Sequence, residues 1–143
     1  MKNSFEICVR GIILQQGKIL ICQMKRGGHY FFPGGHVNLG EKAENALRRE
    51  LREELGIGLK KLSFIGTVEN IYKDKKLRHH EVNLVFSVSV EKPHQNSLED
   101  HISFKFMTLK EFSNKKVLPV VLQKMVLRWF KDKKIFWASK NGE

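Results

Sequence analysis

The most informative segment of the sequence is residues 35–57, GHVNLGEKAENALRRELREELGI, which predicts a helix preceded by a loop and closed by a glycine. Residues 42–55 are mostly good helix formers, and Gly56 can adopt the left-handed conformation that closes a helix. At 100° per residue, three glutamates share an arc of roughly 100° on this predicted helix, and three leucines occupy the adjoining arc. We expect the leucines to pack against a sheet. The glutamates are Glu50, Glu53 and Glu54, and the leucines are Leu47, Leu51 and Leu55.

Three carboxylates on one helix face repel one another and cost stability unless something neutralises them. Mg²⁺ and Mn²⁺ prefer hard oxygen ligands, so a bound divalent cation would turn this cost into a gain. The other residues of the acidic arc, Ala43 and Ala46, are small and are expected to leave space there. The alternative is a charged surface helix on which the glutamate spacing carries no function.

The spacing of these residues resembles the Nudix box, G-x5-E-x7-R-E-U-x-E-E-x-G-U, in which U is an aliphatic residue. All nine specified positions match, beginning at Gly35 and ending at Ile57. The resemblance implies a single Nudix domain over residues 1–143, with an α/β fold in which an α/β/α sandwich surrounds a mixed β-sheet. It also implies hydrolysis of a pyrophosphate bond in a nucleoside diphosphate that is linked to another moiety.

The resemblance also implies roles within the motif. The three glutamates Glu50, Glu53 and Glu54 would bind Mg²⁺ or Mn²⁺, with the backbone carbonyl of Gly35 as a further metal ligand in some members. Arg49 would hold a catalytic glutamate by a charge-assisted hydrogen bond, although a simple i,i+4 pair with Glu53 is the alternative. The positions expected to fix the loop and the helix are Gly35, Glu41 and Gly56.

Strands surround this segment in a mixed order, with helices packed on a sheet. They are predicted from alternating apolar residues bounded by turn residues, and the first two are joined by a tight turn at Gln16 and Gly17. The predicted strands cover residues 7–14, 18–24, 62–72, 77–90 and 102–107.

Two further helices are predicted after the last of these strands. Thr108 and Glu111 have the spacing of a capping box, which opens a short helix. Pro119 is suited to the start of a second long helix over residues 119–133. The predicted packing face of that helix consists of Val120, Val121, Met125 and Trp129.

The two cysteines do not form a disulfide framework. A two-residue turn would place Cys8 opposite Lys25 rather than Cys22, so we expect two buried thiols and no bridge. The first residues lack the apolar run of a signal peptide, and no stretch approaches 18 consecutive apolar residues. These features predict a cytoplasmic protein without a membrane partner.

A carboxylate outside the motif is also expected to take part in catalysis. Glu81 lies on the polar face of the strand Leu77–Val90, and we expect that face to aim it into a cleft over the metal-binding helix. Glu81 is therefore the first candidate for the general base, with Glu50 as the alternative inside the motif. Glu99 and Asp100 are the fallback. His79 and His80 point to opposite faces of the strand and cannot both join Glu81 in one metal site.

Candidate substrate contacts come from three other positions. Phe32 belongs to an aromatic run, Tyr30 to Phe32, that could stack on a nucleobase, although aromatic residues entering a sheet are more often core. Tyr72 follows the motif near a position where some dinucleoside polyphosphate hydrolases of the family carry tyrosine. Asn83 accompanies Glu81 on the polar strand face. The sequence does not select one nucleotide substrate.

The net charge of +11 favours anionic partners. The excess is concentrated in residues 101–143, which carry ten basic and three acidic side chains. A small nucleotide, such as a dinucleoside polyphosphate, a nucleotide sugar or a modified deoxynucleotide, is the favoured substrate. The alternatives are the 5′ end of an RNA and a catalytically silent Nudix fold that binds nucleotide or RNA. A homodimer is compatible with the family resemblance.

Overall fold

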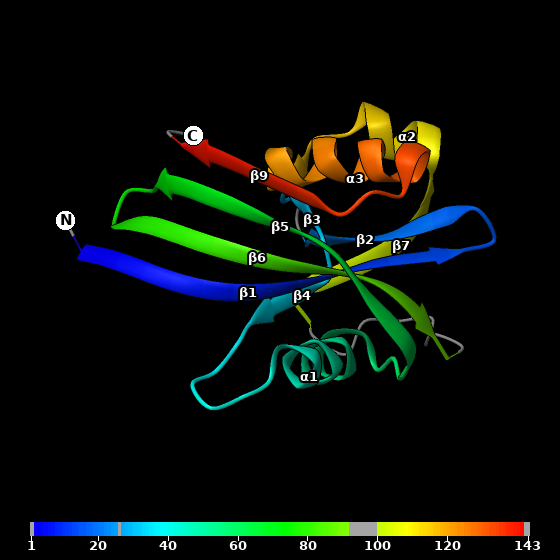
Figure 1. Cartoon of the computed structure of the whole chain (residues 1–143), viewed down its shortest axis with the longest axis horizontal. Helices are drawn as coiled ribbons and strands as arrows, with labels where there is room; N and C mark the ends of the chain where they lie inside the picture. The colour runs from blue at the N-terminus through cyan, green and yellow to red at the C-terminus, as the bar shows by residue number, and fades with distance from the viewer. Residues whose placement is uncertain (1, 26, 92–99, 142–143) are drawn as a thin grey trace.

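The computed structural model describes residues 2–25, 27–91 and 100–141, which form three layers (Figure 1). A curled mixed sheet lies in the middle. Helix α1, Ala43–Leu55, covers one face of the sheet, and α2, Leu109–Asn114, and α3, Val120–Asp132, cover the other. The α/β/α sandwich implied by the sequence motif is confirmed.

The sheet has nine strands, ordered β8-β3-β2-β1-β6-β5-β9, with β4 paired to β1 and β7 paired to β2. Parallel pairing joins β1 to β6 and β5 to β9, whereas β5 and β6 are antiparallel. The strands are β1 Lys2–Gln15, β2 Lys18–Met24, β3 Tyr30–Phe31, β4 Gly34–His36, β5 Leu59–Lys73, β6 Leu77–Val90, β7 Ile102–Thr108, β8 Val117–Leu118 and β9 Phe136–Asn141.

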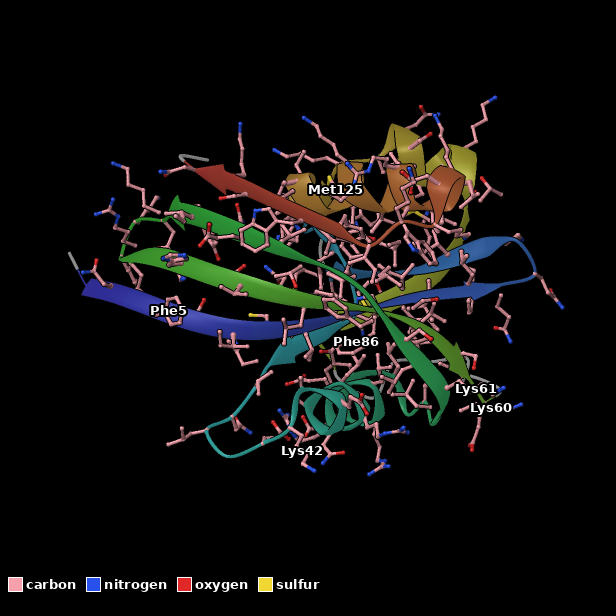
Figure 2. All side chains as sticks on the ribbon, viewed as in Figure 1. Phe5, Lys42, Lys60, Lys61, Phe86 and Met125 are labelled. Carbon is pink, nitrogen blue, oxygen red and sulfur yellow. The ribbon has the colours of Figure 1, made fainter. Side chains whose placement is uncertain are left out.

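Each face of the sheet has its own hydrophobic core. The leucines of α1 pack against Val9, Ile13, Phe86 and Val88, so the predicted apolar helix face is buried as expected. On the opposite face, residues of β1, β5 and β6 pack against α2 and α3. Figure 2 shows Phe86 on the α1 side of the sheet and Met125 on α3, across the sheet from α1. Alternate residues of one strand therefore serve two separate cores.

The helix boundaries agree with the local sequence signals. Gly56 closes α1 at φ 64° and donates its N–H to the Arg52 carbonyl at 3.0 Å. The capping box opens α2, because Thr108 Oγ1 accepts from the Glu111 N–H and the Thr108 N–H donates to Glu111 Oε1. The buried face of α3 is displaced from the predicted one. Its buried residues are Leu122, Gln123, Val126 and Trp129.

Pairing between distant strands corrects other expectations. The tight turn at Gln16–Gly17 is present, but β1 pairs with β2 only at its last two residues. Cys8 therefore lies opposite His36 of β4 and Asn83 of β6, not opposite Lys25. The thiols of Cys8 and Cys22 are buried and form no disulfide. Burial raises the pKa of the Cys8 thiol to about 12, which makes it unreactive at neutral pH.

Several strands were not predicted because they are short or lie outside the apolar periodicity; these are β3, β4, β8 and β9. Strands β1 and β5 also extend beyond their predicted ends. Within the described ranges, none of the helices is both long and apolar enough to cross a membrane.

Candidate active site

The acidic arc of α1 contains carboxylates in three different environments. Glu54 is only 5% exposed, because it borders the leucine face that packs on the sheet. The side chains of Glu50 and Glu53 are 16% and 53% exposed. Ala46 does not leave space in the arc as predicted: it is fully buried in the core between α1 and the sheet. The acidic surface is therefore formed by the glutamates alone, at the edge of a packed interface.

Arg49 links these glutamates to the loop before the helix. Its Nη1 donates to Glu50 Oε1 at 2.9 Å and to Glu53 Oε2 at 3.3 Å. The guanidinium also forms a bidentate pair with Glu41, at 2.8 and 3.0 Å, and donates to the His36 carbonyl at 3.0 Å. Arg49 is thus more than an i,i+4 partner of Glu53, since it joins both glutamates to two points of the loop.

The opposite charges of this network stabilise each other's ionised forms. Hydrogen bonds from Arg49, and then from the Asn38 N–H, lower the pKa of Glu41 to about 2. The hydrogen bond to Glu41 is likewise the main cause that raises the pKa of Arg49. At neutral pH Glu41 is therefore a fixed anion that holds the guanidinium beside Glu50 and Glu53.

Gly35 of β4 lies directly against the carboxylate of Glu50. A Cβ atom added at position 35 would come within 2.5 Å of Glu50 Cδ. The preceding residue, Gly34, has φ 139° and leaves no space for a side chain beside the Val9 carbonyl. These two glycines let the backbone of β4 approach the acidic end of α1, which explains their place before the helix.

The donor set fits a hard divalent cation. Three carboxylates share one helix face, and the Gly35 backbone lies beside one of them, so oxygen is the common ligand atom. Within residues 2–25, 27–91 and 100–141, however, no three carboxylate, imidazole or thiol groups are already close enough together to hold one ion. Glu50 and Glu53 are bonded to Arg49 instead, so metal binding requires their side chains to rotate.

A cavity of about 540 Å³ lies beside β4. Gly35 lines it, so one residue separates the cavity from the Glu50 carboxylate. The lining includes the apolar side chains Met24, Phe31, Leu118 and Pro119. Its polar side chains are Arg10, His29, Asn70, Tyr72, Glu81 and Lys116.

Glu81 lines this cavity, but it does not face the metal-binding helix as predicted. Its strand partners Glu6 and Asn70 share the face of the sheet that packs against α3, whereas α1 covers the opposite face. The direction was predicted wrongly because the sequence does not reveal which face of β6 receives α1. Glu81 is 9% exposed, and Tyr72 Oη donates to its Oε1 at 3.0 Å. Burial, and then the Glu81 carboxylate, raises the pKa of Tyr72, which therefore stays a hydrogen-bond donor.

The expected substrate contacts of Phe32 and Asn83 are not possible in this arrangement. Phe32 is fully buried and packs edge-to-face on Phe112, with ring centroids 5.8 Å apart. Asn83 is also fully buried, and its Oδ1 accepts from Arg10 Nε at 3.2 Å. The neighbouring Phe31 lines the cavity instead.

Arg10 is a cavity residue that the sequence reasoning missed. It donates to Asn83 Oδ1 and, through Nη1, to the Phe32 carbonyl at 3.0 Å. The partners are separated by 73 and 22 residues, so no local motif could have indicated them. The only available signal was a charged residue inside an apolar strand.

The two histidines of β6 are held on opposite faces, as the alternation predicts. His79 Nε2 lies 2.9 Å from Asp74 Oδ2, and its ring stacks on Tyr72 at 4.6 Å. His80 Nε2 lies 2.7 Å from Glu69 Oε2. Among the fallback carboxylates, Asp100 is exposed, and Glu99 lies outside the described residues.

The fold and the motif together define a class of protein: an α/β/α domain with a carboxylate-bearing helix beside a glycine-rich strand. The NUDIX domain family matches residues 6–130, which is most of the chain. The chain belongs to the Nudix family.

Curated relatives cover parts of this domain. The chain is 36% identical over 87 residues to an ADP-ribose pyrophosphatase from Methanocaldococcus jannaschii, covering 59% of this chain and 50% of the relative. It is 39% identical over 67 residues to an 8-oxo-dGTP diphosphatase from Buchnera aphidicola, covering 46% of this chain and 54% of the relative. The chain thus spans about half the length of these relatives.

Solved structures agree on the fold. A mutator MutT protein from Bacillus halodurans superimposes with a TM-score of 0.81 at 17% identity, covering 95% of this chain and 89% of that one. A MutT protein from Methanosarcina mazei Go1 gives 0.74 at 22% identity, covering 94% and 99%. At these identities the likeness concerns the fold alone.

Proposed function

We propose that this protein is a metal-dependent pyrophosphohydrolase that cleaves a small nucleotide containing a diphosphate linkage. The observation that carries the proposal is the place of Gly35, which lines the cavity on one side and contacts the Glu50 carboxylate on the other. A nucleotide seated in the cavity could thereby extend its phosphates past β4 to the acidic end of α1.

Glu50, Glu53 and Glu54 are the residues that would hold Mg²⁺ or Mn²⁺, with the Gly35 carbonyl as an additional oxygen. When bound, such a cation neutralises the diphosphate and lowers the pKa of the attacking water. Arg49 bonds Glu50 and Glu53, and it would remain beside them as a counter-charge after their side chains rotate toward the cation. Glu41 would keep Arg49 in place, and Gly56 would end the helix after the last carboxylate.

Glu50 is the better placed carboxylate to accept the proton of the attacking water, and Glu81 is the alternative. Glu50 lies beside Gly35 on the helix that bears the other two glutamates. Glu81 lies on the opposite face of the sheet and already accepts from Tyr72. The reaction would break one phosphoric anhydride bond, with the water oxygen joining one phosphorus and the bridging oxygen leaving with the other.

The test is a substrate panel of nucleotide sugars, dinucleoside polyphosphates, modified deoxynucleotides and capped RNA, assayed with Mg²⁺ and with Mn²⁺. The expected result is release of a nucleoside monophosphate from at least one small nucleotide in the presence of metal. Absence of metal-dependent cleavage across the panel contradicts the proposal.

The 5′ end of an RNA is the second candidate substrate. Two observations favour it: a 37% identical relative over 62 residues is an RNA pyrophosphohydrolase from Edwardsiella ictaluri, and basic side chains of α3 and the following turn are exposed. RNA binding through these side chains predicts a log–log salt slope steeper than about −3, whereas a small nucleotide predicts a modest slope. The exposed basic residues are Lys124, Arg128, Lys131, Lys133 and Lys134.

A further inference from the structure

The floor of the cavity is formed by two polar side chains on adjacent strands. Asn70 of β5 and Glu81 of β6 are direct partners in the antiparallel pairing, so their side chains lie on the same face of the sheet. They are 5% and 9% exposed. Both line the cavity. A ligand in the cavity therefore meets an amide and a carboxylate side by side.

These two side chains offer more hydrogen-bond acceptors than the protein satisfies. Tyr72 donates to Glu81 Oε1, and a carboxylate has the capacity to accept further hydrogen bonds. Asn70 Oδ1 is buried and has no hydrogen-bond partner among the described residues. A buried acceptor without a donor is costly, so a ligand that brings N–H groups is stabilised there.

The rest of the cavity suits a flat ring. Met24, Phe31, Leu118 and Pro119 provide apolar walls around a volume of about 540 Å³, within the range of small-molecule sites. Arg10 is held by Asn83 and the Phe32 carbonyl, which use two of its five N–H donors. The remaining donors can meet a carbonyl oxygen of the ligand.

We propose that this cavity binds a purine with the guanine-type edge, in which the Glu81 carboxylate accepts from the ring N1–H and from the 2-amino group, and Asn70 Oδ1 accepts from the second N–H of the 2-amino group. Arg10 faces the 6-oxo group. Adenine lacks both the N1–H donor and the 6-oxo acceptor, and the pyrimidines lack two adjacent donors beside a carbonyl. The inference rests on the proposed function, because it names the base of the same nucleotide whose phosphates extend past Gly35.

The test is calorimetric binding of GMP, IMP and AMP to the wild-type protein, since monophosphates require no cleavage. GMP and IMP differ only in the 2-amino group, so their ratio measures the second donor. GMP is expected to bind about tenfold or more tightly than IMP, and IMP more tightly than AMP. Equal binding of GMP and IMP, or no GMP binding at millimolar concentration, overturns the proposal.

Two variants test whether Glu81 and Asn70 are the residues that select GMP over IMP. Glu81→Gln and Asn70→Ala are each expected to bring the GMP-to-IMP affinity ratio within about threefold of unity. Glu69→Gln is the matched control, because Glu69 precedes Asn70 on β5, points to the opposite face and pairs with His80 and Ser139. It should keep the wild-type ratio. An unchanged ratio in both cavity variants, with wild-type circular dichroism, contradicts the assignment.

The outcome also separates this inference from the proposed function. If the protein binds GMP selectively but hydrolyses no substrate of the metal-dependent panel, the base assignment is supported and the proposed pyrophosphohydrolase activity is contradicted. If the protein hydrolyses nucleotides but binds GMP and IMP equally, the proposed activity is supported and the base assignment is contradicted.

Discussion

The two sides of the sheet differ in how their polar residues are brought together. On the α1 side, the glutamates and Arg49 come from one helix and the loop before it, within residues 35–57. On the other side, the cavity collects residues from the distant strands β1, β5 and β6 and from the segment before α3. The first side is therefore built by local spacing along the chain, whereas the second depends on pairing between distant segments.

The largest effect is expected from the α1 side. Glu54→Gln keeps the size of the side chain but removes the charge that would bind the metal. Turnover should fall more than about 100-fold, because loss of even an outer-shell partner of a metal site typically costs 10–100-fold. Circular dichroism should remain that of the wild type. The exposed Glu44→Gln on the same helix serves as the control, and near-normal turnover of the Glu54 variant at saturating Mg²⁺ would rule out the metal assignment.

Glu50 and Glu81 lie on opposite faces of the sheet and are the two candidates for the general base. If Glu50 accepts the proton, Glu50→Gln should lower kcat by about 100-fold. Glu81→Gln should leave kcat within about threefold and change substrate preference, as expected for a residue that contacts the base. The measurement is kcat and KM from pH 6 to 9. A loss of about 100-fold in kcat for Glu81→Gln, with unchanged metal affinity, would instead make Glu81 the general base.

Two adjacent aromatic residues, Phe31 of β3 and Phe32 directly after it, are expected to have different roles. Phe32 is fully buried, so Phe32→Ala should lower the free energy of unfolding by about 3–5 kcal/mol. Phe31 lines the cavity, so Phe31→Ala should mainly raise KM. Urea denaturation and steady-state kinetics measure the two effects. Reversed results for the two variants would show that Phe32 contacts the substrate after all.

The smallest effect is a pH dependence at the end of β6. The hydrogen bond with Asp74, and then the ion pair with Glu6 at 3.5 Å, raises the pKa of His79. Protonated His79 therefore stabilises the folded state. This stabilisation is complete at pH values below the pKa of His79 in the unfolded chain, and it is lost as the pH rises through the pKa of His79 in the folded protein. His79→Gln should therefore lower Tm more at about pH 5.5 than at about pH 9. Equal losses of Tm at both pH values would contradict the ion pairs of His79.

The sequence predicted the α1 side well because its geometry is local. Helix periodicity places the glutamates and leucines, and Gly56 ends the helix through its own backbone conformation. The cavity side depends on strand pairing over long separations, such as the contact of Arg10 with Asn83. The alternation of β6 correctly separated its two faces, but it could not show which face α1 covers. For this reason the predicted direction of Glu81 was wrong. The predicted substrate contacts of Phe32 and Asn83 were wrong because long-range packing, which the sequence does not show, buries both side chains completely.

Mn²⁺ binding distinguishes a metal site on α1 from a metal site in the cavity. Electron paramagnetic resonance can measure the Mn²⁺ affinity of the wild-type protein, of Glu53→Gln/Glu54→Gln and of Asn70→Ala/Glu81→Gln, without any substrate. We predict that the α1 double variant loses at least about tenfold in Mn²⁺ affinity, because it removes two oxygen ligands, while the cavity double variant binds Mn²⁺ like the wild type. Wild-type affinity in the α1 variant, or a comparable loss in the cavity variant, would contradict the account.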